Sequence, residues 1–135
     1  MKVFQIAGDW GMDNLRPDER PDPQPKRGEV LLRMKMASLN ARDLIVPERG
    51  YGRATGELPL IPVSDGVGEI VAVGEGVDSL ATGDRVCPTY FQNWDDGAPG
   101  KDNLASGLGG PLDGVMAELV CLPARGVVKV PDYLT

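Results

Sequence analysis

The stretch that decides the fold runs from Leu58 to Val86 and reads LPLIPVSDGVGEIVAVGEGVDSLATGDRV. Val67 and residues 70–73 form an apolar run rich in β-branched side chains, and glycines stand at positions 66, 68, 74 and 76. This pattern predicts a buried strand that the backbone enters and leaves through tight turns. Gly83 and Asp84 predict a turn into a second strand over residues 85–87. The fold is therefore expected to be mainly β.

The rest of the chain continues this pattern on both sides. Strands are expected over residues 1–7, 30–36, 115–122 and 126–130. In the second of these, Val30, Leu32, Met34 and Met36 are expected to share the buried face.

Between the strands, several segments predict other structure. Four prolines predict that residues 9–26 form an extended connection without regular structure. Residues 37–46 change period and predict a short helix that Ser38 or Asn40 caps. Glycine-rich loops are expected over 48–57 and 88–111.

Composition limits the possible functions. With 135 residues the chain can form one domain with a modest core. A net charge of −6, without a long run of Lys or Arg, argues against nucleic acid or an anionic membrane as partner. No apolar run is long enough to span a bilayer, so a soluble, cytoplasmic protein is expected. Cys87 and Cys121 lie in apolar runs and are expected to be buried free thiols rather than a disulfide. The absence of histidine removes the commonest general base and zinc ligand.

Three motifs together resemble a known family. Residues 62–77 with 83–86, residues 38–43 and residues 114–120 look like landmarks of the GroES-like domain of medium-chain dehydrogenases/reductases. That superfamily contains the alcohol dehydrogenases and quinone oxidoreductases. The resemblance covers residues 1–135 and implies a partly open, GroES-like β-barrel with one or two short helices. It also implies a longer parent protein that binds NAD or NADP and forms a homodimer, as members of the family often do.

The glycine pairs do not supply the cofactor site themselves. A dinucleotide-binding Gly-x-Gly-x-x-Gly ends a strand and begins a helix. The glycines at 66, 68, 74 and 76 are instead embedded in β pattern, so they are interpreted as strand-packing and turn glycines. The dinucleotide-binding domain of the family is therefore expected to lie outside this chain, as a missing partner.

The resemblance is to the zinc-independent branch. In zinc-dependent members a cysteine stands at the position of Asn40, and a His-Glu pair stands at Ser64 and Asp65. An amide and a hydroxyl are poor zinc ligands. The loop over 88–111, where structural-zinc cysteines would fall, has none. No metal is therefore expected.

Asn40 and Tyr51 are the candidate catalytic residues. Hydride reduction places negative charge on the substrate oxygen, and either side chain can donate a hydrogen bond there. The resemblance also places Asn40 beside the nicotinamide, which makes it a candidate cofactor contact; the alternative is that Asn40 only caps the helix. Asp43 is expected to hold the helix start or to pair with Arg42 or Arg53.

Asp65, Phe91, Gln92 and Trp94 are the candidate substrate-binding residues. The resemblance places the loop beside the substrate cleft, where aromatic rings would form a flat apolar wall. The alternative for the loop residues is packing onto their own domain. For Asp65 the alternative is a turn former.

Two functions of different classes follow. The first is the substrate-facing domain of a zinc-independent, NAD(P)H-dependent oxidoreductase that passes hydride to a carbonyl, quinone or activated alkene, or takes it from an alcohol. The isolated chain would then be inactive. The alternative is a free-standing GroES-like interaction module that acts as a co-chaperonin does. The aromatic and acidic loop argues against the alternative, and a structural zinc protein is a weaker third hypothesis.

Overall fold

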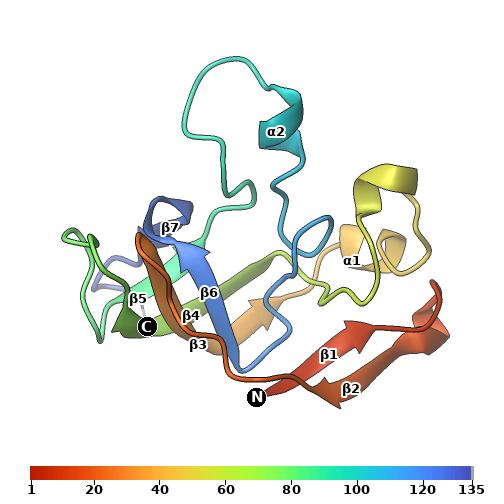
Figure 1. Ribbon diagram of the computed structural model, residues 1–135, viewed down its shortest axis with the longest axis horizontal. Helices are drawn as coiled ribbons and strands as arrows, with labels where there is room; N and C mark the ends of the chain where they lie inside the picture. The colour runs from red at the N-terminus through yellow and green to blue at the C-terminus, as the bar shows by residue number, and fades with distance from the viewer. Residues whose placement is uncertain (135) are drawn as a thin grey trace.

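The computed structural model describes residues 1–134. A five-stranded antiparallel sheet with the order β6-β3-β4-β5-β7 curls into a partly open barrel, and a two-stranded ribbon, β1-β2, lies beside it (Figure 1). The strands are β1 Lys2–Ile6, β2 Leu15–Glu19, β3 Glu29–Ser38, β4 Asp65–Val73, β5 Arg85–Pro88, β6 Leu119–Pro123 and β7 Val127–Lys129. The helical turns are η1 Met12–Asn14, α1 Arg42–Ile45, η2 Gly52–Thr55, α2 Lys101–Leu104 and η3 Ala124–Gly126. The predicted fold class, a mainly β barrel with short helices, is confirmed.

The deciding stretch forms the centre of the sheet. β4 pairs with β3 on one side and β5 on the other, and Ile70 is fully buried. Gly74 follows β4 so closely against the carbonyl of Lys26 that a Cβ would overlap it. Gly83 has φ +94°, which favours glycine at the turn before β5. The glycines thus serve packing and turns, as predicted, and no helix follows them.

Two apolar clusters hold the domain together. The larger lies inside the curled sheet and contains Val30, Leu32, Ile70, Val86, Leu108, Val120, Leu122 and Val127. The smaller joins the ribbon to α1 through Ile6, Val46 and Leu60. Burying each such side chain contributes about 1.5–3 kcal/mol relative to leaving it in water. The second cluster matters for the site because it fixes α1 against the ribbon.

The predicted face of β3 is wrong at its end. Val30 and Leu32 are buried, but Met36 is 66% exposed. The pairing of β3 with β4 shifts register between Met34 and Met36. An inserted residue turns the following side chains to the other face of the strand. The last residues of β3 therefore face outward.

The prediction that residues 9–26 lack regular structure is also wrong. Leu15–Glu19 forms β2, with Pro17 opposite Phe4. The N–H of Phe4 donates to the carbonyl of Met116 at 2.9 Å, so it points away from β2. Pro17 therefore occupies a position where the ladder needs no N–H, and an edge strand tolerates it.

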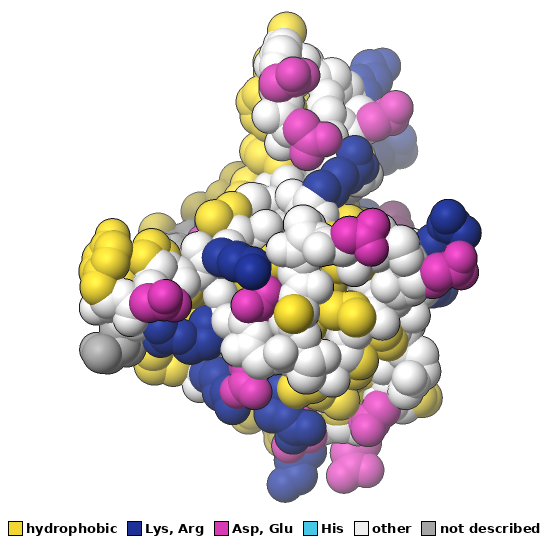
Figure 2. All heavy atoms as spheres, turned by 90° about the vertical axis from the view of Figure 1, so that its left-hand side faces the viewer, with side chains coloured by type: hydrophobic (Ala, Val, Ile, Leu, Met, Phe, Trp, Pro, Cys, Tyr) yellow, Lys and Arg dark blue, Asp and Glu magenta, His cyan; other side chains and the backbone are white. Residues whose placement is uncertain are grey.

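The segment before β6 is not strand, contrary to the prediction of a strand over 115–122. Residues 115–118 are tied instead by single contacts, such as Glu118 N–H to Lys2 O at 3.0 Å and Met34 N–H to Glu118 O at 3.0 Å. The predicted loop over 88–111 contains α2 and projects well beyond the barrel (Figures 1 and 2). The predicted loop over 48–57 contains η2. Within residues 1–134 no helix is long and apolar enough to cross a membrane.

Candidate functional site

The site is built around the carboxylate of Asp65. Asp65 begins β4 and is the register partner of Ser38, the last residue of β3. Its Oδ2 accepts hydrogen bonds from Asn40 Nδ2 at 2.9 Å and from Ser64 Oγ at 2.6 Å. Ser64 is buried, Asp65 is half-buried and Asn40 is exposed. We call Asn40, Ser64 and Asp65 the Asp65 cluster; it places Asn40 and Asp65, two of the predicted site residues, in direct contact.

Asn40 does not cap α1 with its side chain. The N-cap is Ala41, and no side chain bonds to the helix start there. Asp43, inside the first turn, instead accepts the backbone N–H of Asn40 through Oδ2 at 2.7 Å. The prediction that Asp43 holds the helix start is confirmed. Its other oxygen, Oδ1, is buried without a hydrogen-bond partner among the described residues.

A groove of about 420 Å³ opens beside the cluster, on the outer side of the sheet. Its lining includes Ser38, Asp65, Val67 and Cys87. Both cysteines are free thiols, as predicted, but the prediction that they are buried is wrong. Cys87 is exposed in the groove, whereas Cys121 is half-buried elsewhere and its burial raises the pKa of its thiol. The groove thus joins a polar end at Asp65 to an apolar floor.

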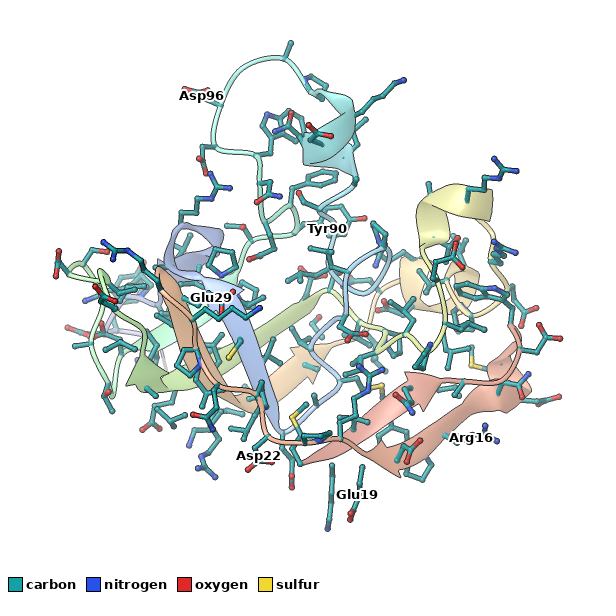
Figure 3. All side chains as sticks on the ribbon, viewed as in Figure 1. Arg16, Glu19, Asp22, Glu29, Tyr90 and Asp96 are labelled. Carbon is teal, nitrogen blue, oxygen red and sulfur yellow. The ribbon has the colours of Figure 1, made fainter. Side chains whose placement is uncertain are left out.

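The projecting loop carries the aromatic residues. Tyr90 and Phe91 meet edge to face at 4.4 Å between ring centroids, and Phe91 lies 5.4 Å from Trp94. Trp94 Nε1 donates to the carbonyls of Asp96 and Gly97 at 3.1 and 3.2 Å. Figure 3 shows Tyr90 at the base of the loop and Asp96 near its outer bend. Phe91 and Trp94 are half-buried, so part of each ring remains available as a wall.

Arg42 anchors the base of this loop to α1. Its guanidinium donates to the carbonyls of Leu108 and Gly110 at 3.1 and 3.2 Å and to the hydroxyl of Tyr90 at 3.0 Å. The same group lies 4.9 Å from the centre of the Tyr90 ring. Arg42 is therefore committed to the loop, and the predicted pairing of Asp43 with Arg42 or Arg53 is not observed among the described residues.

Gln92 and Tyr51 lie apart from the Asp65 cluster. Gln92 is 2% exposed, and its Nε2 donates to the carbonyls of Thr89 and Gly126 at 2.7 and 3.1 Å. The Gln92 side chain therefore points into the interior of its own domain, in agreement with the alternative that the loop residues pack onto that domain. Tyr51 is 44% exposed and lies over the guanidinium of Arg42, 5.9 Å from its ring centre. The substrate role of Gln92 and the catalytic role of Tyr51 stay predictions.

The donor set of the cluster does not fit zinc. Zinc favours thiolate, imidazole and carboxylate ligands. The cluster offers one carboxylate, and its Oδ2 already accepts hydrogen bonds from the amide and the hydroxyl beside it. Within residues 1–134 no three His, Cys, Asp or Glu side chains are placed to share a metal ion.

Sequence reasoning missed the roles of Ser64 and Arg42. Ser64 was noted only as a departure from the zinc pattern, although its place before Asp65 brings the two side chains together. Arg42 bonds to residues 48 to 68 positions away in the sequence. Only an alternating-charge or cation–aromatic pattern could have pointed to it, and neither is visible.

Known proteins resemble this chain in sequence and fold. The alcohol dehydrogenase GroES-like domain family matches residues 26–132. A zinc-type alcohol dehydrogenase-like protein of Schizosaccharomyces pombe is 42% identical over 126 residues, which cover 93% of this chain and 36% of the relative. The crystal structure of a putative alcohol dehydrogenase from Sinorhizobium meliloti superposes with a TM-score of 0.88 at 35% identity, covering 99% of this chain and 40% of that one.

A third similar structure is described as an NAD-dependent alcohol dehydrogenase. It has a TM-score of 0.82 at 29% identity and covers 100% of this chain and 41% of that one. The chain thus spans about two fifths of the length of the proteins it resembles. These matches favour the dehydrogenase hypothesis over the co-chaperonin alternative. The chain belongs to the alcohol dehydrogenase GroES-like domain family of NAD(P)-dependent oxidoreductases.

Proposed function

We propose that this chain is the substrate-facing domain of a zinc-independent, NAD(P)H-dependent oxidoreductase. The substrate is a carbonyl, quinone or activated alkene reduced by hydride, or an alcohol oxidised in reverse. The observation that carries the proposal is the Asp65 cluster, which occupies the outer end of two central strands beside an open groove. The nicotinamide cofactor supplies the hydride, and a separate dinucleotide-binding domain holds it.

This chain's own residues have two tasks in that reaction. The groove receives an apolar, flat substrate and excludes water from one side of it, and the Phe91–Trp94 pair offers a second apolar surface on the projecting loop. The Asp65 cluster provides fixed polar groups at the groove's end, held on strands and a helix start rather than on a mobile loop. Polar groups that are already held in place lose little conformational freedom when they bind a ligand.

The ligand chemistry of the cluster supports a zinc-free site, and this part of the proposal can be tested directly. The purified chain is loaded with zinc and dialysed against metal-free buffer, and its metal content is then measured by mass spectrometry. We expect less than one tenth of an equivalent to be retained, because a lone carboxylate holds zinc weakly (about one order of magnitude below stoichiometric loading). Stoichiometric zinc that survives dialysis would show that the proposal assigns the wrong branch.

The division of labour between domains has its own test. The chain alone is mixed with NADPH and a panel of quinones, enones and ketones, and absorbance at the nicotinamide band is followed. We expect no turnover, because no element in residues 1–134 forms the strand-loop-helix unit that binds a dinucleotide. Turnover by the chain alone would refute the need for a second domain. Adding a dinucleotide-binding domain of the same family is the complementary arm, and the mixture should then oxidise NADPH.

A further inference from the structure

The hydrogen bonds of the Asp65 cluster fix the direction in which the Asn40 amide points. An asparagine amide has two hydrogens on Nδ2 and an acceptor oxygen, Oδ1. Nδ2 of Asn40 donates to Asp65 Oδ2 at 2.9 Å and to the carbonyl of Ser38 at 3.3 Å. Both hydrogens therefore have acceptors within the protein.

The opposite orientation of the amide is unfavourable. Turning it by half a rotation would set Oδ1 against the carboxylate of Asp65 and the carbonyl of Ser38, both of which only accept here. Asp65 Oδ2 also receives the hydroxyl of Ser64 at 2.6 Å, so it serves as an acceptor for both neighbours. The backbone of Asn40 is held as well, by its N–H bond to Asp43. Main chain and side chain of Asn40 are thus both oriented.

From this geometry we infer that Asp65 is a positioning residue that turns the oxygen of Asn40 away from Asp65 and Ser38, to the exposed side of the cluster, where a ligand can meet it. The inference rests on the proposed function and narrows its substrate class. The site takes a ligand that offers a hydrogen-bond donor, an alcohol hydroxyl or an amide N–H, at Asn40. A bare carbonyl meets an acceptor there, and the donor for a developing oxyanion must come from a group other than Asn40.

The test compares benzyl alcohol with benzaldehyde, which have the same ring and nearly the same size but differ in the donor. Each is titrated into the ¹⁵N-labelled chain, and the backbone amides of residues 38–40 and 65 are followed by NMR together with the Asn40 side-chain amide. We expect benzyl alcohol to bind about three- to tenfold more tightly, which is the effect of one hydrogen bond. Equal affinity for the two compounds would overturn the inference. So would a change in the chemical shifts of the Asn40 Nδ2 hydrogens that benzaldehyde causes and benzyl alcohol does not.

Two variants separate the roles of the two side chains. Asp65→Asn keeps the shape but removes the fixed acceptor, so the preference should fall to within about twofold. Asn40→Ala should abolish the preference while leaving Asp65 in place. If Asn40→Ala retains it, Asp65 itself receives the ligand and the inference fails.

The matched control is Glu69→Gln. Glu69 lies on the same strand as Asp65, and its substitution also replaces a carboxylate by an amide. Its carboxylate pairs with Lys35 at 3.0 Å rather than with Asn40. This variant should keep the full preference. Thermal unfolding of each variant checks the fold, and if Asp65→Asn does not fold, Asn40→Ala carries the test.

The outcomes distinguish the inference from the proposed function, because the titration needs neither cofactor nor turnover. A preference for the alcohol in the chain, with no oxidation of NADPH once the chain is combined with a dinucleotide-binding domain, would support the inference and count against the function. Oxidation of NADPH without the preference would do the reverse.

Discussion

Replacing Arg42 by lysine should destabilise the domain by about 2–3 kcal/mol. The guanidinium donates to two carbonyls of residues 108–110 and to the hydroxyl of Tyr90, all at 3.0–3.2 Å. A hydrogen bond to a charged group contributes about 1.5–3 kcal/mol, and the ammonium of lysine can keep only part of this planar arrangement. The carbonyls that lose their donor are in a buried segment, which adds to the cost.

Urea unfolding followed by tryptophan fluorescence measures this change. We expect the midpoint to fall with little change in slope, and the melting temperature to drop by about 6–12 °C for a domain of this size. Arg53→Lys is the matched control, because Arg53 is exposed on η2, and it should change stability by less than about 0.5 kcal/mol.

A double-mutant cycle with Tyr90→Phe tests whether the contact between Arg42 and Tyr90 contributes to the loss of stability. Tyr90→Phe removes one hydrogen bond to Arg42 and should cost about 0.5–1.5 kcal/mol. Since the two side chains touch, the double variant should lose less than the sum of the single losses, by at least about 0.5 kcal/mol. Strict additivity, or an Arg42→Lys variant as stable as the parent, would show that the guanidinium does not hold the loop.

Three further outcomes are expected. Gly74→Ala should destabilise the domain by about 3 kcal/mol in urea unfolding, because a Cβ there overlaps a backbone carbonyl that has no room to move. The hydrogen bond from Lys129 and a backbone N–H hold the pKa of Asp84 below its usual 3.8, so this stabilisation is complete above about pH 4 and is lost as pH falls through the lower native pKa. Asp84→Asn should therefore flatten the fall of the melting temperature below pH 4. Dithionitrobenzoate should modify Cys87 rapidly and Cys121 slowly, and Cys87→Ser should remove the fast phase.

The fold was largely predictable because local signals and global pairing agree in the central strands. The β-branched run with its glycines marks β4, and alternation marks the first half of β3. Pro17 shows where local signals mislead. A proline weakens a strand only if the ladder needs its N–H, and whether it does depends on the direction in which Phe4 bonds, which no local pattern records.

The contact between Asn40 and Asp65 could not be predicted from the sequence. Asn40 and Asp65 are 25 positions apart, and their bond depends on the pairing of Ser38 with Asp65 after an irregularity in β3. A shift of one residue would send the side chains to opposite faces. The prediction of Asn40 as a helix cap failed for the same reason, because a partner across the sheet outcompetes the helix end.

These contacts divide the site into two halves that should evolve and respond differently. The Asp65 cluster lies on strand ends and a helix start, so a substitution there changes the polarity presented to the ligand and little else. The aromatic wall lies on the projecting loop, and its base depends on Arg42. A substitution in that loop can alter the shape of the aromatic wall without disturbing the Asp65 cluster. The loop should therefore set which ligand shapes are accepted, and Asp65 should set the hydrogen-bond preference. The Phe91→Ala variant should then weaken the binding of benzyl alcohol and of benzaldehyde by the same factor.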